Sequence, residues 1–186
     1  GWADSDGDGA LDKDGIPLRL TLAGDARREA LLGDIQLQLK ANCGIEVETR
    51  LLTRGELEGD WPDGVIFGRR FDLALFGWNV GAAPPCEVWT TTQIPSDANP
   101  GGANDTGYSN PAFDAACRRA RTTLDPQHAT QSHAEAQRIF AEDLPVLPLF
   151  FWPKLAAARA PVQGFVLDPT SPSELWNIEE LRRIEP

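Results

Sequence analysis

The sequence predicts an α/β fold in which helices flank a mixed sheet. Apolar and polar residues alternate over 17–23 and again over 45–51, as in half-buried strands, and residues 26–41 between them carry leucine and isoleucine at helical spacing. The order strand, helix, strand is typical of a right-handed βαβ unit with parallel strands. The almost wholly apolar run over 71–77 suits a third strand that is buried on both faces.

Local signals place the start of the first strand and of the first helix. Pro17 can sit only at the start or the edge of a strand, because proline lacks the N–H that a central strand donates. Asp25 is placed to cap the helix over 26–41. The apolar positions of that helix are Leu31, Leu32, Ile35 and Leu39.

Loops dominate the middle of the chain. Residues 53–70 are rich in glycine and charge and are expected to form a short helix and loops. Glycine and proline interrupt residues 79–85 and 91–107, on either side of a short helix predicted near 86–91. Surface loops carry function more often than cores do.

Two capped helices follow, over 110–123 and 126–143. Each opens with an N-cap residue and then proline at the first helical position, which is a strong start signal. The start pairs are Asn110 with Pro111 and Asp125 with Pro126. The first helix presents an apolar face of Phe113, Ala116, Cys117, Ala120 and Leu124. The inward stripe of the second is Ala129, Ala136, Ile139 and Phe140.

The rest of the chain is punctuated by proline. Residues 145–152 predict another buried strand or extended segment, and residues 175–184 a short helix or strand. With 186 residues, of which 41% are hydrophobic, the chain is expected to form one globular domain. Because Gly1 follows no start Met and the sequence holds no Met, we interpret it as a piece of a longer chain.

The charge balance excludes several classes of partner. The 28 acidic and 17 basic residues give a net charge of −11, which repels nucleic acid and anionic lipid surfaces. No stretch approaches the roughly 18 uninterrupted apolar residues of a membrane span. Nucleic acid is therefore not expected as a partner.

The opening stretch GWADSDGDGALDKDG resembles part of a calcium loop. Its candidate ligands are the carboxylates of Asp4, Asp6, Asp8 and Asp12 and the carbonyl of Ala10. The position that closes such loops with a bidentate carboxylate is Gly15, so the pattern is incomplete. An acidic turn that leads into a strand is an equally good interpretation, because Asp and Gly supply the bonds and the positive φ that tight turns need.

No enzyme is predicted. A nucleophilic site needs a Ser or Cys beside a His, but Cys117 lies on an apolar helical face and the two histidines, His128 and His133, lie on the next helix. The Gly-rich stretch at 99–107 lacks the lysine of a phosphate loop. Three cysteines without a CxxC pattern leave open one disulfide with a free thiol or three buried thiols.

Trp78 is the candidate wall of a ligand site. It ends a predicted buried strand and begins a loop, and open α/β sheets bind ligands beyond the carboxyl ends of their strands. Large aromatic side chains are common in the walls of such pockets. Packing within the core is the alternative for Trp78.

Four stretches together resemble family 5 of the extracytoplasmic solute-binding proteins of ABC transporters, the peptide and nickel class. They lie at 1–22, 71–78, 99–120 and 136–152, in the order of that family, and GYSNPAFD and EDLPVLPLF are the more specific parts. The resemblance implies that residues 1–186 are the C-terminal lobe of a periplasmic-binding-protein type II fold. Such proteins hold a ligand between two lobes and pass it to a permease, and no cofactor is required.

The resemblance also implies particular site residues. Trp78 and Asn79 line the cleft, and Gly81 stands where peptide binders of this family carry the Asp that holds the peptide amino group. A peptide, a sugar, a nickel chelate or another solute therefore stays open as the ligand. A location outside the cytoplasm, as a periplasmic protein or a lipoprotein, favours a disulfide between Cys86 and Cys117. The alternative from another class is an extracellular calcium-stabilised interaction module.

Overall fold

A computed structural model describes residues 1–78, 85–151, 153, 155–168, 171, 173 and 175–184. These residues form two compact units. The first unit contains the described residues up to 145, and the second unit contains those from 146 onward. None of the helices in the described residues combines the length and the apolar composition that a membrane span requires.

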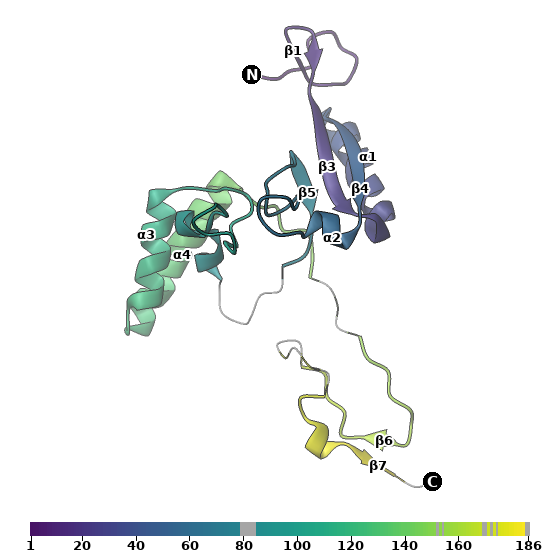
Figure 1. The fold of residues 1–186 in the computed structure, drawn as a ribbon, viewed down its shortest axis with the longest axis vertical. Coiled ribbons are helices and arrows are strands. Elements are labelled where there is room, and N and C mark those ends of the chain that lie inside the picture. Colours follow the sequence, from purple (N-terminus) through teal and green to yellow (C-terminus); the bar gives the residue numbers. More distant parts are fainter. Residues whose placement is uncertain are drawn as a thin grey trace. The chain divides into compact units, whose positions relative to one another are not determined.

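The centre of the first unit is a parallel sheet of three strands. Its strands are β3 (Arg19–Asp25), β4 (Glu46–Leu52) and β5 (Leu73–Leu75), in the order β4-β3-β5. Helix α1 (Glu29–Cys43) connects β3 to β4 and lies along both strands (Figure 1). The predicted parallel βαβ unit is confirmed. Its core holds Leu22, Leu32 and Val47, with Ile35 and Leu39 packed against them.

The start of α1 differs in detail from the prediction. Asp25 does cap the turn that begins there, since its side chain accepts a hydrogen bond from the backbone N–H of Arg27 at 2.9 Å. That turn is a 3₁₀ helix (Ala26–Arg28), and α1 follows it. Gly44 ends α1 with a positive φ of 66°, which a residue without Cβ adopts freely.

The apolar run 71–77 forms less strand than predicted. Only the three residues of β5 pair with β3, and all three are half-buried, so the prediction of a longer strand buried on both faces is wrong. The carboxylate of Asp72 accepts hydrogen bonds from the backbone N–H and the hydroxyl of Thr21, at 2.8 and 2.7 Å. A side chain thus replaces the backbone pairing at this point, and the strand begins after it.

A second core packs beside the sheet. Helix α2 (Arg54–Leu57) opens with a capping box between Thr53 and Glu56, and the loop after it folds back over the sheet. The buried residues of this core are Ala23, Leu52, Leu57, Val65 and Ile66. The short helix and loops predicted over 53–70 are confirmed.

A helical hairpin completes the first unit. It consists of α3 (Pro111–Thr122) and α4 (Pro126–Asp143), which lie side by side (Figure 1). The side chains of Asn110 and Asp125 cap them as predicted. Leu124, predicted on the apolar face of α3, is fully exposed, because α3 ends at Thr122 and Leu124 falls in the turn before α4.

The opening stretch ends in a small surface hairpin. Strands β1 (Asp12–Lys13) and β2 (Ile16–Pro17) pair antiparallel, and Asp14 and Gly15 between them have positive φ angles of 55° and 74°. The hairpin leads into β3, as the turn interpretation of this stretch predicts.

The second unit has little regular structure. Strands β6 (Val162–Gln163) and β7 (Arg182–Arg183) pair antiparallel, and a 3₁₀ helix (Ile178–Glu180) precedes β7, as predicted for 175–184. The buried strand predicted at 145–152 is wrong for the described part of that range, 145–151: Leu147 is 66% exposed and Phe151 92%. Prolines at 145 and 148 remove backbone donors there, and no strand among the described residues pairs with it.

Candidate ligand-binding site

Trp78 lies just beyond the carboxyl end of β5, where a parallel sheet offers a ligand site. It is half-buried, with ring centroids 5.1 Å from Phe76 and 4.8 Å from Trp89. Its indole N–H is buried without a hydrogen-bond partner among the described residues. Trp78 thus packs against other aromatic rings with part of its side chain and exposes the rest. Its indole N–H is not used by any described residue.

The aromatic contacts continue from Trp89 into the helical hairpin. The ring of Trp89 lies 5.3 Å from Phe140 of α4, and Phe140 lies 5.7 Å from Phe113 of α3 and 5.8 Å from Tyr108. Tilted and edge-to-face pairs at these distances are favourable beyond the area they bury. The row therefore connects the end of β5 to the buried core of the hairpin.

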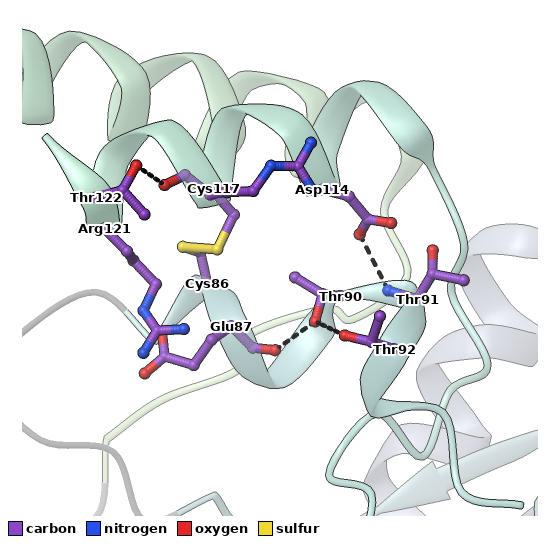
Figure 2. Close-up of a disulfide and its surroundings, with 10 residues drawn as sticks. Cys86, Glu87, Thr90, Thr91, Thr92, Asp114, Cys117, Arg121 and Thr122 are labelled. Carbon is purple, nitrogen blue, oxygen red and sulfur yellow. Dashed lines mark hydrogen bonds and ion pairs between the residues drawn. A yellow bond between two sulfur atoms is a disulfide. The ribbon is translucent and has the colours of Figure 1, made fainter.

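A disulfide fastens the segment that carries Trp89 to α3. Cys86, in the 3₁₀ helix Cys86–Trp89, is bonded to Cys117 of α3 across a Cα–Cα distance of 5.7 Å (Figure 2). Beside it the guanidinium of Arg121 lies 3.8 Å from the carboxylate of Glu87. The third cysteine, Cys43, is free and exposed.

Asn104 organises the loop between the disulfide segment and α3, and sequence reasoning missed it. The residue is completely buried, and its amide donates hydrogen bonds to the carbonyls of Trp89, Thr90 and Tyr108 at 2.8 to 3.0 Å. Its oxygen accepts from the backbone N–H of Tyr108 at 3.2 Å. An Asn in a Gly-rich loop is typical of any turn, so the sequence holds no signal that singles out this one.

Tyr108 and Asn110 join this loop to the end of α4. The hydroxyl of Tyr108 and the side-chain amide of Asn110 both donate to Asp143, each at 2.7 Å. These two bonds lower the pKa of Asp143, and burial followed by the bond to Asp143 raises the pKa of Tyr108. The loop is therefore held at both ends by side-chain hydrogen bonds.

The structure describes one member of the predicted ligand-binding set. Of its three members, Trp78 is described, while Asn79 and Gly81 lie outside the described residues. The structure adds to that set Trp89, whose ring contacts Trp78.

In the opening stretch the acidic residues separate into two groups. Carboxylate oxygens of Asp4, Asp6 and Asp8 lie within 4.8 Å of one another and are exposed. Each also accepts a hydrogen bond from a backbone N–H of the same loop. Asp12 is not in this group: its carboxylate accepts from the hydroxyl and the backbone N–H of Ser5, and these bonds lower its pKa. The backbone N–H of Ala10 donates to Asp8 at 2.8 Å.

The chain has relatives among peptide-binding proteins. It is 28% identical over 189 residues to the oligopeptide-binding protein AppA of Bacillus subtilis, which covers 97% of this chain and 32% of AppA. It is 30% identical over 131 residues to di/tripeptide-binding protein 4 of Pseudomonas aeruginosa, which covers 70% of this chain and 24% of that protein. No family model matches the chain.

Solved structures of solute-binding proteins also match the chain. The structure of B. subtilis AppA in complex with a nonapeptide matches 100% of this chain and 35% of AppA with a TM-score of 0.71 at 25% identity. NikZ of Campylobacter jejuni, in complex with Ni(L-His), matches 78% of this chain and 28% of NikZ with a TM-score of 0.64 at 20% identity, which shows the fold alone. The chain thus spans about a third of the length of AppA and about a quarter of the length of the other two proteins.

The resemblance found in the sequence is confirmed. The relatives and structural neighbours are solute-binding proteins of the peptide and nickel class, and the fold is part of a periplasmic-binding-protein type II fold with a parallel sheet and flanking helices. Several relatives are named as periplasmic, in agreement with the predicted location outside the cytoplasm.

Proposed function

We propose that this chain supplies the C-terminal lobe of an extracytoplasmic protein that binds a peptide or a related small molecule for uptake by an ABC transporter. The observation that carries the proposal is the similarity to a peptide-binding protein over the whole chain, in sequence and in structure. Because the chain spans about a third of AppA, the other lobe of the binding cleft is provided by residues outside this sequence. The permease of the transporter is the second partner, and no catalytic role is proposed.

The first unit is the part that we assign to the lobe, since it holds the parallel sheet and the buried cores. The second unit exposes large apolar side chains, among them Leu147, Phe151 and Leu155, which are 66%, 92% and 83% exposed. Exposed apolar surface on this scale is typical of an interface. We assign this surface to packing against the remainder of the same protein.

Trp78 is the proposed wall of the cleft. Its position beyond β5, its partial exposure and its indole N–H, which has no hydrogen-bond partner among the residues described, all suit a side chain that contacts a bound solute. Asn79 and Gly81 are proposed to line the same cleft. Since Gly81 has no carboxylate to hold a peptide amino group, the solute classes to test are peptides, sugars and nickel chelates.

Replacing Trp78 with alanine in the full-length protein is expected to weaken solute binding. A thermal-shift screen identifies the solute, because a ligand that binds the native state raises the melting temperature. Loss of an aromatic wall worth about 1.5 to 3 kcal/mol corresponds to roughly 10- to 150-fold in affinity. Trp2→Ala is the matched control, since Trp2 lies in the opening loop and is 46% exposed. Equal affinities for Trp78→Ala and wild type would exclude Trp78 from the cleft.

A structural calcium ion in the opening loop is a second, separate proposal, favoured by the three carboxylates within 4.8 Å of one another. Exposed carboxylates that already accept backbone hydrogen bonds are weak ligands, so we expect a dissociation constant of about 10⁻⁴ to 10⁻³ M, as in extracellular modules. Calorimetry on chelator-stripped protein with millimolar calcium checks this. Absence of both heat and a change in melting temperature would leave the stretch as an acidic turn.

A further inference from the structure

Asp105 is a buried carboxylic acid that the proposed function does not use. It follows Asn104 in the loop before α3 and has 0% of its surface exposed. Neither of its side-chain oxygens has a hydrogen-bond partner in the part of the chain that the structure describes. Buried carboxylates are normally paired or hydrogen-bonded, because an isolated charge is very costly to remove from water.

The charged side chains around this loop are engaged elsewhere. Arg69 packs on the loop, since a Cβ on Gly107 would lie 3.2 Å from its Cδ, but its guanidinium donates to the carbonyl of Pro95 and lies 5.1 Å over the ring of Trp61. The charged groups on the elements that flank the loop have other partners. Glu87 forms an ion pair with Arg121, and the carboxylate of Asp114 accepts a hydrogen bond from the backbone N–H of Thr91. The carboxylate of Asp143 accepts hydrogen bonds from Tyr108 and Asn110. Among the described residues, no ion pair reaches Asp105.

Burial without a counter-charge favours the neutral form. It raises the pKa of Asp105 from 3.8 to about 7, while the backbone N–H groups of Asp105 and Thr106 lower it by less. Asp105 is therefore a neutral acid in the folded protein below about pH 7.

The position of Asp105 links its charge to the candidate cleft. Its neighbour Asn104 bonds the carbonyls of Trp89 and Thr90, and the ring of Trp89 packs on Trp78. A charge that forms inside the loop draws water toward it and disturbs these bonds. Displacement of Trp89 then removes the support on which Trp78 rests.

We propose that Asp105 is a pH-dependent switch: the neutral acid can stay buried in the loop 103–109, which the hydrogen bonds of Asn104 hold together, whereas ionisation loosens the loop and with it the contact between Trp89 and Trp78. The effect on solute capture rests on the proposed function. The loosening of the loop does not depend on the proposed function, so the experiments below test it without a ligand.

The direction of the pH effect follows from linkage. The unfolded chain releases the Asp105 proton near pH 4 and the folded protein near pH 7, so between these values the folded state binds one more proton. The contribution of Asp105 to stability is fully favourable below pH 4, falls as the pH rises toward 7, and stays at its lowest value above 7.

Thermal unfolding of the full-length protein, wild type and Asp105→Asn, from pH 4 to 9 tests the switch. Asn has the same shape but no charge, so we expect similar melting temperatures near pH 4, an advantage of Asp105→Asn that grows up to pH 7, and a constant advantage above it. Asp34→Asn, which removes an exposed carboxylate on α1, should follow wild type.

A difference in melting temperature between Asp105→Asn and wild type that does not change with pH would overturn the proposal. So would a lower melting temperature of Asp105→Asn above pH 4, since that would mean that a cation elsewhere in the protein pairs with Asp105.

Tryptophan fluorescence of the native wild type gives a second readout that does not depend on the variant folding. We expect a reversible change with a midpoint near pH 7, as Trp78 and Trp89 separate. A constant signal from pH 5.5 to 8.5 would overturn the proposal. Because neither arm uses a solute, both stay informative even where no solute is found.

Discussion

Replacing Cys86 and Cys117 together with serine is expected to lower the free energy of unfolding by about 3 to 4 kcal/mol. The bond closes a sequence separation of 31 residues, and in the chain-entropy model a loop of that length restricts the unfolded chain by this amount. The loss should come with a looser attachment of the segment that carries Trp89, since the bond joins that segment directly to α3 (Figure 2).

Denaturant unfolding of the double variant and of wild type measures this loss. Cys43→Ser is the matched control, because Cys43 is free and exposed and its replacement should change stability by less than about 0.5 kcal/mol. Thiol titration of the unfolded, unreduced protein should find one thiol. Three thiols, or a double variant as stable as wild type, would contradict the assignment of the bond.

Replacing Phe113 with alanine is expected to lower the free energy of unfolding by about 3 to 5 kcal/mol. Phe113 is 2% exposed and lies at the centre of the hairpin core, with its ring 5.3 Å from Tyr108 and 5.7 Å from Phe140. Alanine leaves a cavity there that neighbours on two helices and a disulfide-bonded segment cannot close.

Leu124→Ala is the control for that measurement. Leu124 lies eleven residues farther along and was predicted on the same apolar face, yet it is 100% exposed, so its loss should cost less than about 0.5 kcal/mol. A loss for Leu124→Ala as large as the one expected for Phe113→Ala would place Leu124 in the core and contradict the end of α3 at Thr122.

Elements with their own local signals could be predicted from the sequence. The caps Asn110 and Asp125 set the starts of α3 and α4, and the alternation in residues 17–23 and 45–51 set β3 and β4 to within one or two residues. Periodicity carries this information because it reports which side of an element meets the core.

Elements that depend on distant partners were predicted less well. The apolar run at 71–77 was predicted as a buried strand and the run at 145–152 as a buried strand or extended segment. Only three residues of the first pair with a neighbour, and residues 147–151 of the second are exposed. An apolar run indicates that a segment is buried in the complete protein, but it does not indicate which other segment packs against it. The chain spans about a third of AppA, so the cover for the second run is proposed to lie outside this sequence.

The candidate site was predicted only in part. Trp78 was selected as a candidate because strand ends are general binding positions, whereas Asn104 and Asp105 look in the sequence like ordinary turn residues. Their burial results from the packing of the 3₁₀ helix Cys86–Trp89, α3 and the loop between them, which local composition does not encode.

Titration calorimetry of the identified solute against the full-length protein and against residues 1–186 tests the central claim most directly. A cleft shared by two lobes gives each lobe only part of the contacts, so we expect clear binding to the full-length protein and binding to residues 1–186 that is at least about 100-fold weaker or undetectable. Near-UV circular dichroism first establishes that the shorter chain is folded. Submicromolar binding of the solute by residues 1–186 alone would contradict the assignment of this chain as one lobe of a two-lobed binding protein.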